Sequence, residues 1–361
     1  MSVPVFSREE LQYDLEFTPI HPRLPTAKRY YNTPITQREN FLRAIRREDP
    51  LWIPKYGDMI CVLPSVLPDP VAKGLVLEYA PFDPKNYGGP DYFGVPWVYE
   101  ELAGGSMPAQ KRPLLKDMND WREFVRFPDP DSWDWAGSAE KNRDYLCRDL
   151  VTQYWFFTGF FERLISFMDF EEAAVALIDE DQTDAIHEFF GELADFYDAL
   201  LERLKRWYDI DCICFHDDAG TQRDSFFSLK TYREMIVPYI RRVVDSCHKR
   251  GILVELHSCG KNDRLIEGIV ETGVDLWTPQ NICDIDDFYD RYGDKIMFGI
   301  NSDLKDLGPL TPEEDVVAAA KRFVKKYGPH MEEKPVLSAS WGAPVLYTDV
   351  IYEESRKLLG Q

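Results

Sequence analysis

The chain has 361 residues and a formal net charge of -21, with 44% hydrophobic and 29% charged residues. This composition is typical of a globular protein with a sizeable core, and the length fits one large barrel or two modest domains. The strong negative charge argues against nucleic acid or an anionic membrane as the main partner, because both would repel the protein. A polyanionic substrate would be repelled for the same reason.

The sequence predicts neither secretion nor membrane insertion. Residues 1–17 lack the basic segment and apolar core of a signal peptide, and no run of about 18 apolar residues occurs. The seven cysteines are scattered, without a repeated disulfide spacing. We therefore expect a cytoplasmic protein with reduced thiols.

The first part of the chain is irregular. Residues 1–35 are rich in proline and predict an extended arm packed on the body or on a second subunit of a homodimer. Thr36 to Glu39 form a capping box that opens a helix, and a first strand is expected over 52–56. The segment 64–135 is rich in Pro, Gly and aromatic residues, which predicts a long loop or lid with little regular structure.

From residue 150 onward, apolar runs alternate with amphipathic segments. Strands are expected over 150–157, 209–215, 252–257, 274–277, 296–300 and 336–339. Helices are expected over 160–179 as two short pieces, then over 182–207, 228–250 with a break at Pro238, 262–271, 285–292, 312–327 and 347–359. The alternation predicts an α/β fold with a parallel sheet. Seven or eight such units, without a Gly-rich phosphate loop after the first strand, favour a single (β/α)8 TIM-barrel domain over 36–361.

Polar residues follow four of these strands, where the loops of a barrel carry its chemistry. They are His216, Asp217, Asp218 and Gln222; His257 and Cys259; Trp277 and Gln280; and Asn301 and Asp303. Each residue alone also fits a turn or a cap. Together, four polar strand ends indicate an active site.

His257 and Cys259 point to a metal. They are one residue apart at a strand end, so their side chains point the same way. Imidazole and thiolate are ligands that zinc prefers, and a third ligand from Asp218 or His216 would leave one coordination position open. Such a site acts as a Lewis acid. An ordinary buried histidine beside a free cysteine is the alternative.

A longer stretch carries a family resemblance. The run FHDDAGTQRDSFFSLKTYREMIVPYIRRVVDSCHKRGILVELHSCG resembles the uroporphyrinogen decarboxylase superfamily, as do GVDLWTPQ, KIMFGINSDL and ENFLRAIRREDPLWIP. The resemblance covers roughly residues 36–359 and implies a (β/α)8 barrel. The superfamily contains true decarboxylases and zinc-dependent methyltransferases that work with corrinoid proteins.

The motifs favour the methyltransferase branch. The decarboxylases hold their anionic substrate with an arginine motif after the first strand, where this chain has KYGDMICVLP and only Lys55. The methyltransferase zinc motif is His-x-Cys followed by a distant Cys. His257 and Cys259 match it, but LSASWGAP near the last strand offers Ser338, Ser340 and Trp341 in place of the distant cysteine.

A second zinc pattern of the superfamily is a weaker match. The aryl-ether demethylases have Glu, a second acid and His at wide spacing, to which Glu180, Asp195 and His216 are similar. Glu180 and Asp195 fall on predicted helical segments, where solvent-facing carboxylates are the simpler interpretation.

The preferred hypothesis is a methyltransferase that demethylates a small methylated substrate, in the first place a methoxylated aromatic compound, and passes the methyl group to the cobalt of a corrinoid. The chain has no Asp-x-His-x-x-Gly motif, so a separate corrinoid protein is expected as the partner. His216, Asp217 or Asp218 would provide acid–base chemistry. Substrate or corrinoid binding is assigned to Gln222, Trp277, Gln280, Asn301 and Asp303. The alternatives are methyl transfer from a methylcobamide to a thiol, uroporphyrinogen decarboxylation, and a non-catalytic corrinoid-binding subunit.

Overall fold

The computed structural model describes residues 4–17, 26–101, 105–109, 113–304, 307–340 and 342–360. The chain separates into two compact units. Unit 1 comprises Met1–Ile60, Cys147–Thr152 and Asp275–Gln361, and unit 2 comprises Cys61–Leu146 and Gln153–Val274. Within each unit, strands that follow one another in the chain pair in parallel, and helices alternate with most of them. The predicted α/β class is thereby confirmed.

The parallel strands of unit 2 are β6 (Cys212–His216), β7 (Leu253–Ser258) and β5 (Val151–Phe156), of which the part from Gln153 onward belongs to this unit. Side chains alternate between the two faces of these strands. On one face, Phe156 and Phe215 pack against Tyr197, with ring centroids 5.2 and 5.7 Å away. On the other face, Gln153 Nε2 donates to Glu255 Oε2 at 2.7 Å. One face of these strands therefore packs against helix side chains, and the other face carries polar groups.

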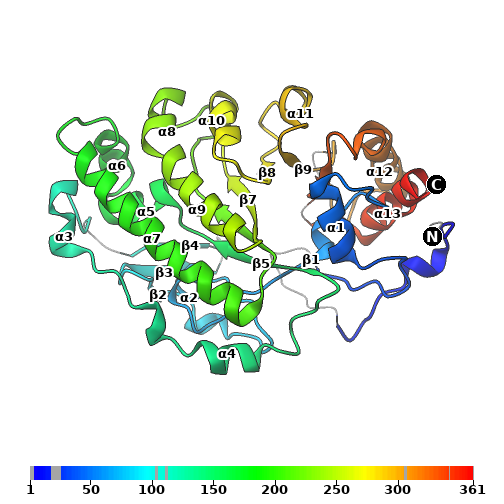
Figure 1. Cartoon of the computed structure of the whole chain (residues 1–361), viewed down its shortest axis with the longest axis horizontal. Helices are drawn as coiled ribbons and strands as arrows, with labels where there is room; N and C mark the ends of the chain where they lie inside the picture. Colours follow the sequence, from blue (N-terminus) through cyan, green and yellow to red (C-terminus); the bar gives the residue numbers. More distant parts are fainter. Residues whose placement is uncertain are drawn as a thin grey trace. The chain divides into compact units, whose positions relative to one another are not determined.

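The helices of unit 2 follow the predicted pattern. They are α5 (Phe160–Met168), α6 (Phe170–Ala176), α7 (Thr183–Tyr208), α8 (Leu229–Met235), α9 (Val237–Lys249) and α10 (Ile266–Glu271). Two short helices lie within 160–179, as expected. Pro238 stands in the first turn of α9, where its missing N–H costs nothing, so the expected break is realised as a second helix. Figure 1 shows α7 and α9 side by side in green.

The segment 64–135 differs from the prediction, because it contains regular structure. It forms α2 (Pro68–Lys73), an antiparallel sheet of β2 (Gly89–Pro90), β3 (Pro96–Glu100) and β4 (Gly105–Pro108), and the short helix α3 (Trp121–Phe124). Helix α4 (Trp135–Lys141) begins at the segment's last residue. Arg163 of α5 holds this segment in place. Its guanidinium is buried, pairs with Asp91 and lies 3.1 Å from Asp69 Oδ2. Ion pairs between residues this far apart in the chain cannot be predicted from a local sequence pattern.

The parallel strands of unit 1 are β8 (Leu276–Pro279), β9 (Met297–Ile300) and β10 (Val336–Ser338). Its helices are α1 (Gln37–Arg46), α11 (Ile285–Tyr292), α12 (Glu313–Tyr327) and α13 (Val345–Leu359). The hydroxyl of Thr36 accepts the N–H of Glu39 at 3.0 Å, which is the predicted helix cap. Helices α12 and α13 lie side by side, orange and red in Figure 1.

The strand expected over 52–56 is wrong. The chain instead turns through a 3-10 helix at Tyr56–Asp58, and β1 covers Met59–Cys61. Two local features prevent the earlier strand. Pro54 has no N–H to give to a sheet, and the N–H of Lys55 donates to Asp58 Oδ2 at 3.2 Å. Lys55 retains one parallel bridge to Ser338 of β10.

The described part of the N-terminal arm is fastened to α13. The carboxylate of Glu10 accepts from Tyr352 Oη at 2.7 Å and from Arg356 Nε at 3.0 Å. Residues 18–25 of the predicted arm, and Trp341 near the last strand, lie outside the described residues. Among the helices that are described, none combines the length and apolar character needed to span a bilayer.

Candidate metal centre

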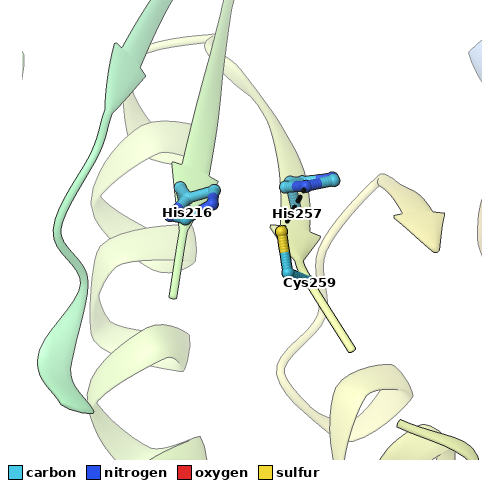
Figure 2. A group of neighbouring side chains, drawn as sticks. All are labelled: His216, His257 and Cys259. Atoms are coloured by element: carbon cyan, nitrogen blue, oxygen red, sulfur yellow. Dashed lines mark hydrogen bonds between the residues drawn. The ribbon is translucent and has the colours of Figure 1, made fainter. Parts of the chain in front are cut away.

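The ends of β6 and β7 bring together three side chains that could bind a metal. His216 and His257 are register partners across the two parallel strands, and Cys259 follows β7 directly. The candidate ligand atoms of these three residues all lie within 4.8 Å of one another. Figure 2 shows both rings and the thiol converging, with the Cys259 sulfur 3.7 Å from His257 Nε2.

This donor set fits zinc. Two imidazoles and one thiolate are ligand types that zinc takes, and three protein ligands are the number found in catalytic sites that keep one position open. All three side chains are partly buried, so a bound ion would be held in the protein yet remain accessible to a substrate. His216, His257 and Cys259 are therefore the residues that could hold a metal.

Two carboxylates orient these ligands. His216 Nδ1 donates to Glu162 Oε2 at 2.8 Å, which leaves Nε2 as the ligand atom. The N–H of Cys259 donates to Asp218 Oδ1 at 2.6 Å, and that oxygen lies 3.4 Å from His216 Nε2. Burial lowers the pKa of His216, but Glu162, the Cys259 thiol and Asp218 outweigh it and hold the pKa well above its usual value. The surroundings thus stabilise positive charge at this point, as an imidazolium or a bound cation.

Asp217 has a positioning function. Its carboxylate accepts the backbone N–H groups of Phe160, Phe161 and Glu162 at 2.9, 3.1 and 2.9 Å, which caps the first turn of α5. Burial and Glu162 raise the pKa of Asp217 to about 7, against the effect of these three donors. A Cβ atom at Gly159 would come 2.4 Å from the Cβ of Asp217, so glycine is needed there. Asp217 consequently fixes the turn that carries Glu162.

The loops after β6 and β7 touch through two glycines. Gly260 has φ +90°, and a Cβ atom there would lie 2.2 Å from the carbonyl carbon of Gly220. The backbones that carry Asp218 and Cys259 are therefore in direct contact.

The other predicted site residues are placed differently. Gln222 is exposed in the loop after β6. Trp277 is completely buried, with ring centroids 5.5 and 5.9 Å from Phe288 and Phe298, so it serves the hydrophobic core of unit 1. Asp303 is exposed and accepts from Arg322 Nε at 2.7 Å. The half-buried Gln280 and Asn301 belong to unit 1, as do Trp277 and Asp303, whereas the metal-binding cluster belongs to unit 2.

The structure does not bring together the residues of the second zinc pattern, Glu180, Asp195 and His216. Glu180 is exposed in the turn before α7. Asp195 lies on α7, is 73% exposed and pairs with Arg242 at 2.6 Å. Neither belongs to the metal-binding group of the described residues, and both are the solvent-facing carboxylates that the sequence suggested.

Sequence reasoning missed Glu162. Its only signal is the charged pair Glu162–Arg163 within the apolar run FTGFFERLISFM, just after a predicted strand. In the structure, Glu162 orients His216, and Arg163 binds the segment that contains α2.

Comparison with known proteins gives one family match. The model of the family described as Uroporphyrinogen decarboxylase (URO-D) matches residues 156–342, about half of the chain, which include the whole cluster. No curated protein matches.

Solved structures give only distant similarities. An IOLI protein with a binding zinc atom is 15% identical, with 50% of this chain and 68% of that chain covered and a TM-score of 0.27. A xylose isomerase-like TIM barrel protein from Mycobacterium smegmatis in complex with magnesium is 11% identical, with 62% and 76% covered and a TM-score of 0.30.

Proposed function

Because the chain belongs to the uroporphyrinogen decarboxylase (URO-D) family, we propose that it is a metal-dependent methyltransferase of that family's corrinoid-linked branch. It takes a methyl group from a small methoxylated aromatic compound and passes it to the cobalt of a corrinoid that a separate protein carries. The observation that carries the proposal is the convergence of His216, His257 and Cys259 at the ends of two adjacent strands. His216 is proposed as the third ligand in place of the distant cysteine that the chain lacks.

The proposed metal is zinc. Bound by these three residues, it would supply a Lewis acid that withdraws charge from the ether oxygen while the bond between that oxygen and the methyl carbon breaks. Asp218, the other candidate for the third ligand, instead holds the backbone of Cys259 by accepting its N–H. Glu162 keeps the His216 ring in the orientation that presents Nε2.

An aromatic substrate is supported by the neighbouring strand. Phe156 of β5 is the register partner of Phe215, so Phe157 comes next to His216 at the adjacent strand end. Phe157 is half-buried, and its ring lies 5.8 Å from that of Trp155. Two aromatic rings beside the metal-binding cluster suit an arene ligand.

The first test is metal content. Wild type purified without a metal-affinity tag is expected to hold about one zinc per chain, and Cys259→Ala should lose most of it. Cys283→Ala is the matched control, since it removes a cysteine thiol that lies in unit 1 and outside the candidate metal cluster. If wild type holds no metal after purification, or if Cys259→Ala keeps full zinc and full activity, the metal-dependent mechanism is ruled out.

The second test is methyl transfer. A reduced corrinoid protein is offered para-methoxybenzoate or the uncharged para-methoxybenzyl alcohol as the methyl donor, and methylation of the cobalt is followed by absorbance. Transfer with at least one donor, abolished in Cys259→Ala, supports the proposal. A zinc-loaded protein that transfers a methyl group from neither donor contradicts it. Consumption of methylcobalamin only in the presence of a thiol would assign the opposite direction.

A further inference from the structure

Lys73 has an unusual position in unit 2. It is the last residue of α2, and its ammonium nitrogen lies 3.2 Å from the centroid of the Trp97 ring on β3. Gly74 continues the chain with φ +70°, and a Cβ atom there would come 2.3 Å from the Tyr99 ring. Because only glycine permits this approach, α2 lies close against β3 and Lys73 is held over the indole face.

The carboxylates of this segment already have partners. Asp69 and Asp91 both pair with Arg163, and Asp91 also accepts from Trp97 Nε1 at 3.0 Å. Among the described residues, no carboxylate lies within ion-pair distance of the Lys73 ammonium, whose close contact is the Trp97 ring. Lys73 is half-buried as a residue, and an ammonium without an ion-pair partner retains donors for an incoming anion.

The helix that carries Lys73 contacts α5 next to Glu162, because Asp69 of α2 lies 3.1 Å from Arg163, the neighbour of Glu162 in the chain. Burial lowers the pKa of Lys73 to about 8, and the charge that opposes this shift most strongly is Glu162. Glu162 is also the residue that accepts from His216 Nδ1. Helix α2 and the candidate metal cluster belong to the same unit, and the charge of Glu162 acts on both the Lys73 ammonium and His216.

We infer that Lys73 binds the carboxylate of the substrate, so that the compounds demethylated here are methoxylated aromatic acids and not neutral aromatic ethers. The inference rests on the proposed function for its reaction and adds the substrate's charge. A chain of net charge -21 repels an anion at long range. A local cation without a carboxylate partner is what an anionic substrate would need in order to bind.

The inference is tested by binding, without a corrinoid. Zinc-loaded wild type is titrated calorimetrically with para-methoxybenzoate and with para-methoxybenzyl alcohol, which has the same ring but no charge. We expect roughly a 10-fold or greater preference for the carboxylate, the effect of one charge-assisted hydrogen bond. Lys73→Met should remove this preference, and Lys73→Arg should keep part of it. Lys230→Met, which removes a lysine that is 82% exposed on α8, should leave it unchanged.

The outcomes separate this inference from the proposed function. A wild type without a preference for the carboxylate, including one that binds neither compound, overturns the assignment of Lys73. So does a folded Lys73→Met variant that keeps the preference, with folding checked by its thermal melt. A preference for the carboxylate that depends on Lys73 supports the assignment even if no methyl transfer is found. Methyl transfer without this preference supports the proposed function and contradicts the assignment of Lys73.

Discussion

His216 and His257 face each other across the parallel β6–β7 pair, with ring centroids 5.3 Å apart and ring planes inclined by 24°. Two of the candidate ligands therefore come from hydrogen-bonded neighbouring strands, and the third follows two residues after His257. The positions of the ligands are fixed by the register of the sheet, a more rigid support than a loop.

The register predicts which residue completes the metal site. Mutation of a residue that only hydrogen-bonds to a metal ligand lowers metal affinity by up to roughly 100-fold. His216→Ala should lower zinc affinity by more than this, because it removes a ligand itself. Asp218→Asn should stay within about 10-fold of wild type, since an amide oxygen can still accept the N–H of Cys259. Zinc competition with a chelator of known affinity measures both. The reverse order of effects would assign the third ligand to Asp218.

Glu162 is predicted to tune the metal through His216. Glu162→Gln keeps an acceptor for Nδ1 but removes the negative charge, so zinc affinity should fall by about 10- to 100-fold while one ion per chain is still bound. Glu171→Gln removes an exposed carboxylate on α6 and serves as the control. Equal zinc affinities in the two variants would show that the Glu162–His216 contact has no effect on the metal.

The Gly220–Gly260 contact predicts a large cost for one methyl group. Gly260→Ala combines the strain of a positive φ with a clash against backbone atoms, and should lower the free energy of unfolding by about 3 kcal/mol or more. Gly251→Ala has φ +67° but no atom within 4 Å of the added Cβ, so it should cost only about 1 kcal/mol. Urea denaturation of both variants measures the difference. Similar costs would contradict the tight contact.

Lys73 predicts a pH dependence of stability. Its folded-state pKa of about 8 lies below the ordinary 10.5, so between these values the unfolded chain binds a proton that the folded chain does not. This contribution to the free energy of unfolding therefore rises with pH from about 8 to about 10.5. Urea titrations across that window should show a smaller rise for Lys73→Met than for wild type. Lys230→Met should follow wild type, and identical slopes in all three proteins would refute the lowered pKa.

The sequence predicted the parts of the site that depend on local pattern. The spacing of His257 and Cys259 at a strand end is sufficient to expect both side chains on one face. The sequence left His216 and Asp218 open as the third ligand, and our proposal of His216 depends on its pairing with His257, a contact between residues far apart in the chain. Glu162 could not be predicted for the same reason: its importance comes from the hydrogen bond to His216, which is also distant in the chain.

The errors in the fold also have physical causes. The residues around Pro54 look like a strand, yet Asp58 takes the N–H of Lys55 and turns the chain. The segment 64–135 reads as a loop because its strands are short, and part of its anchorage comes from the distant Arg163. Helices with long apolar stripes, such as α7, were predicted to within a residue because their period is visible locally.

The contact between Gly220 and Gly260 also bears on transplantation of the metal site. A protein engineer who copies only the His-x-Cys-Gly segment into another barrel would bring the thiol but not the surface against which its loop rests. The recipient would have to offer a side-chain-free backbone at the position of Gly220 and a carboxylate at that of Asp218. The smallest portable unit is thus a pair of neighbouring strand ends with both of their loops.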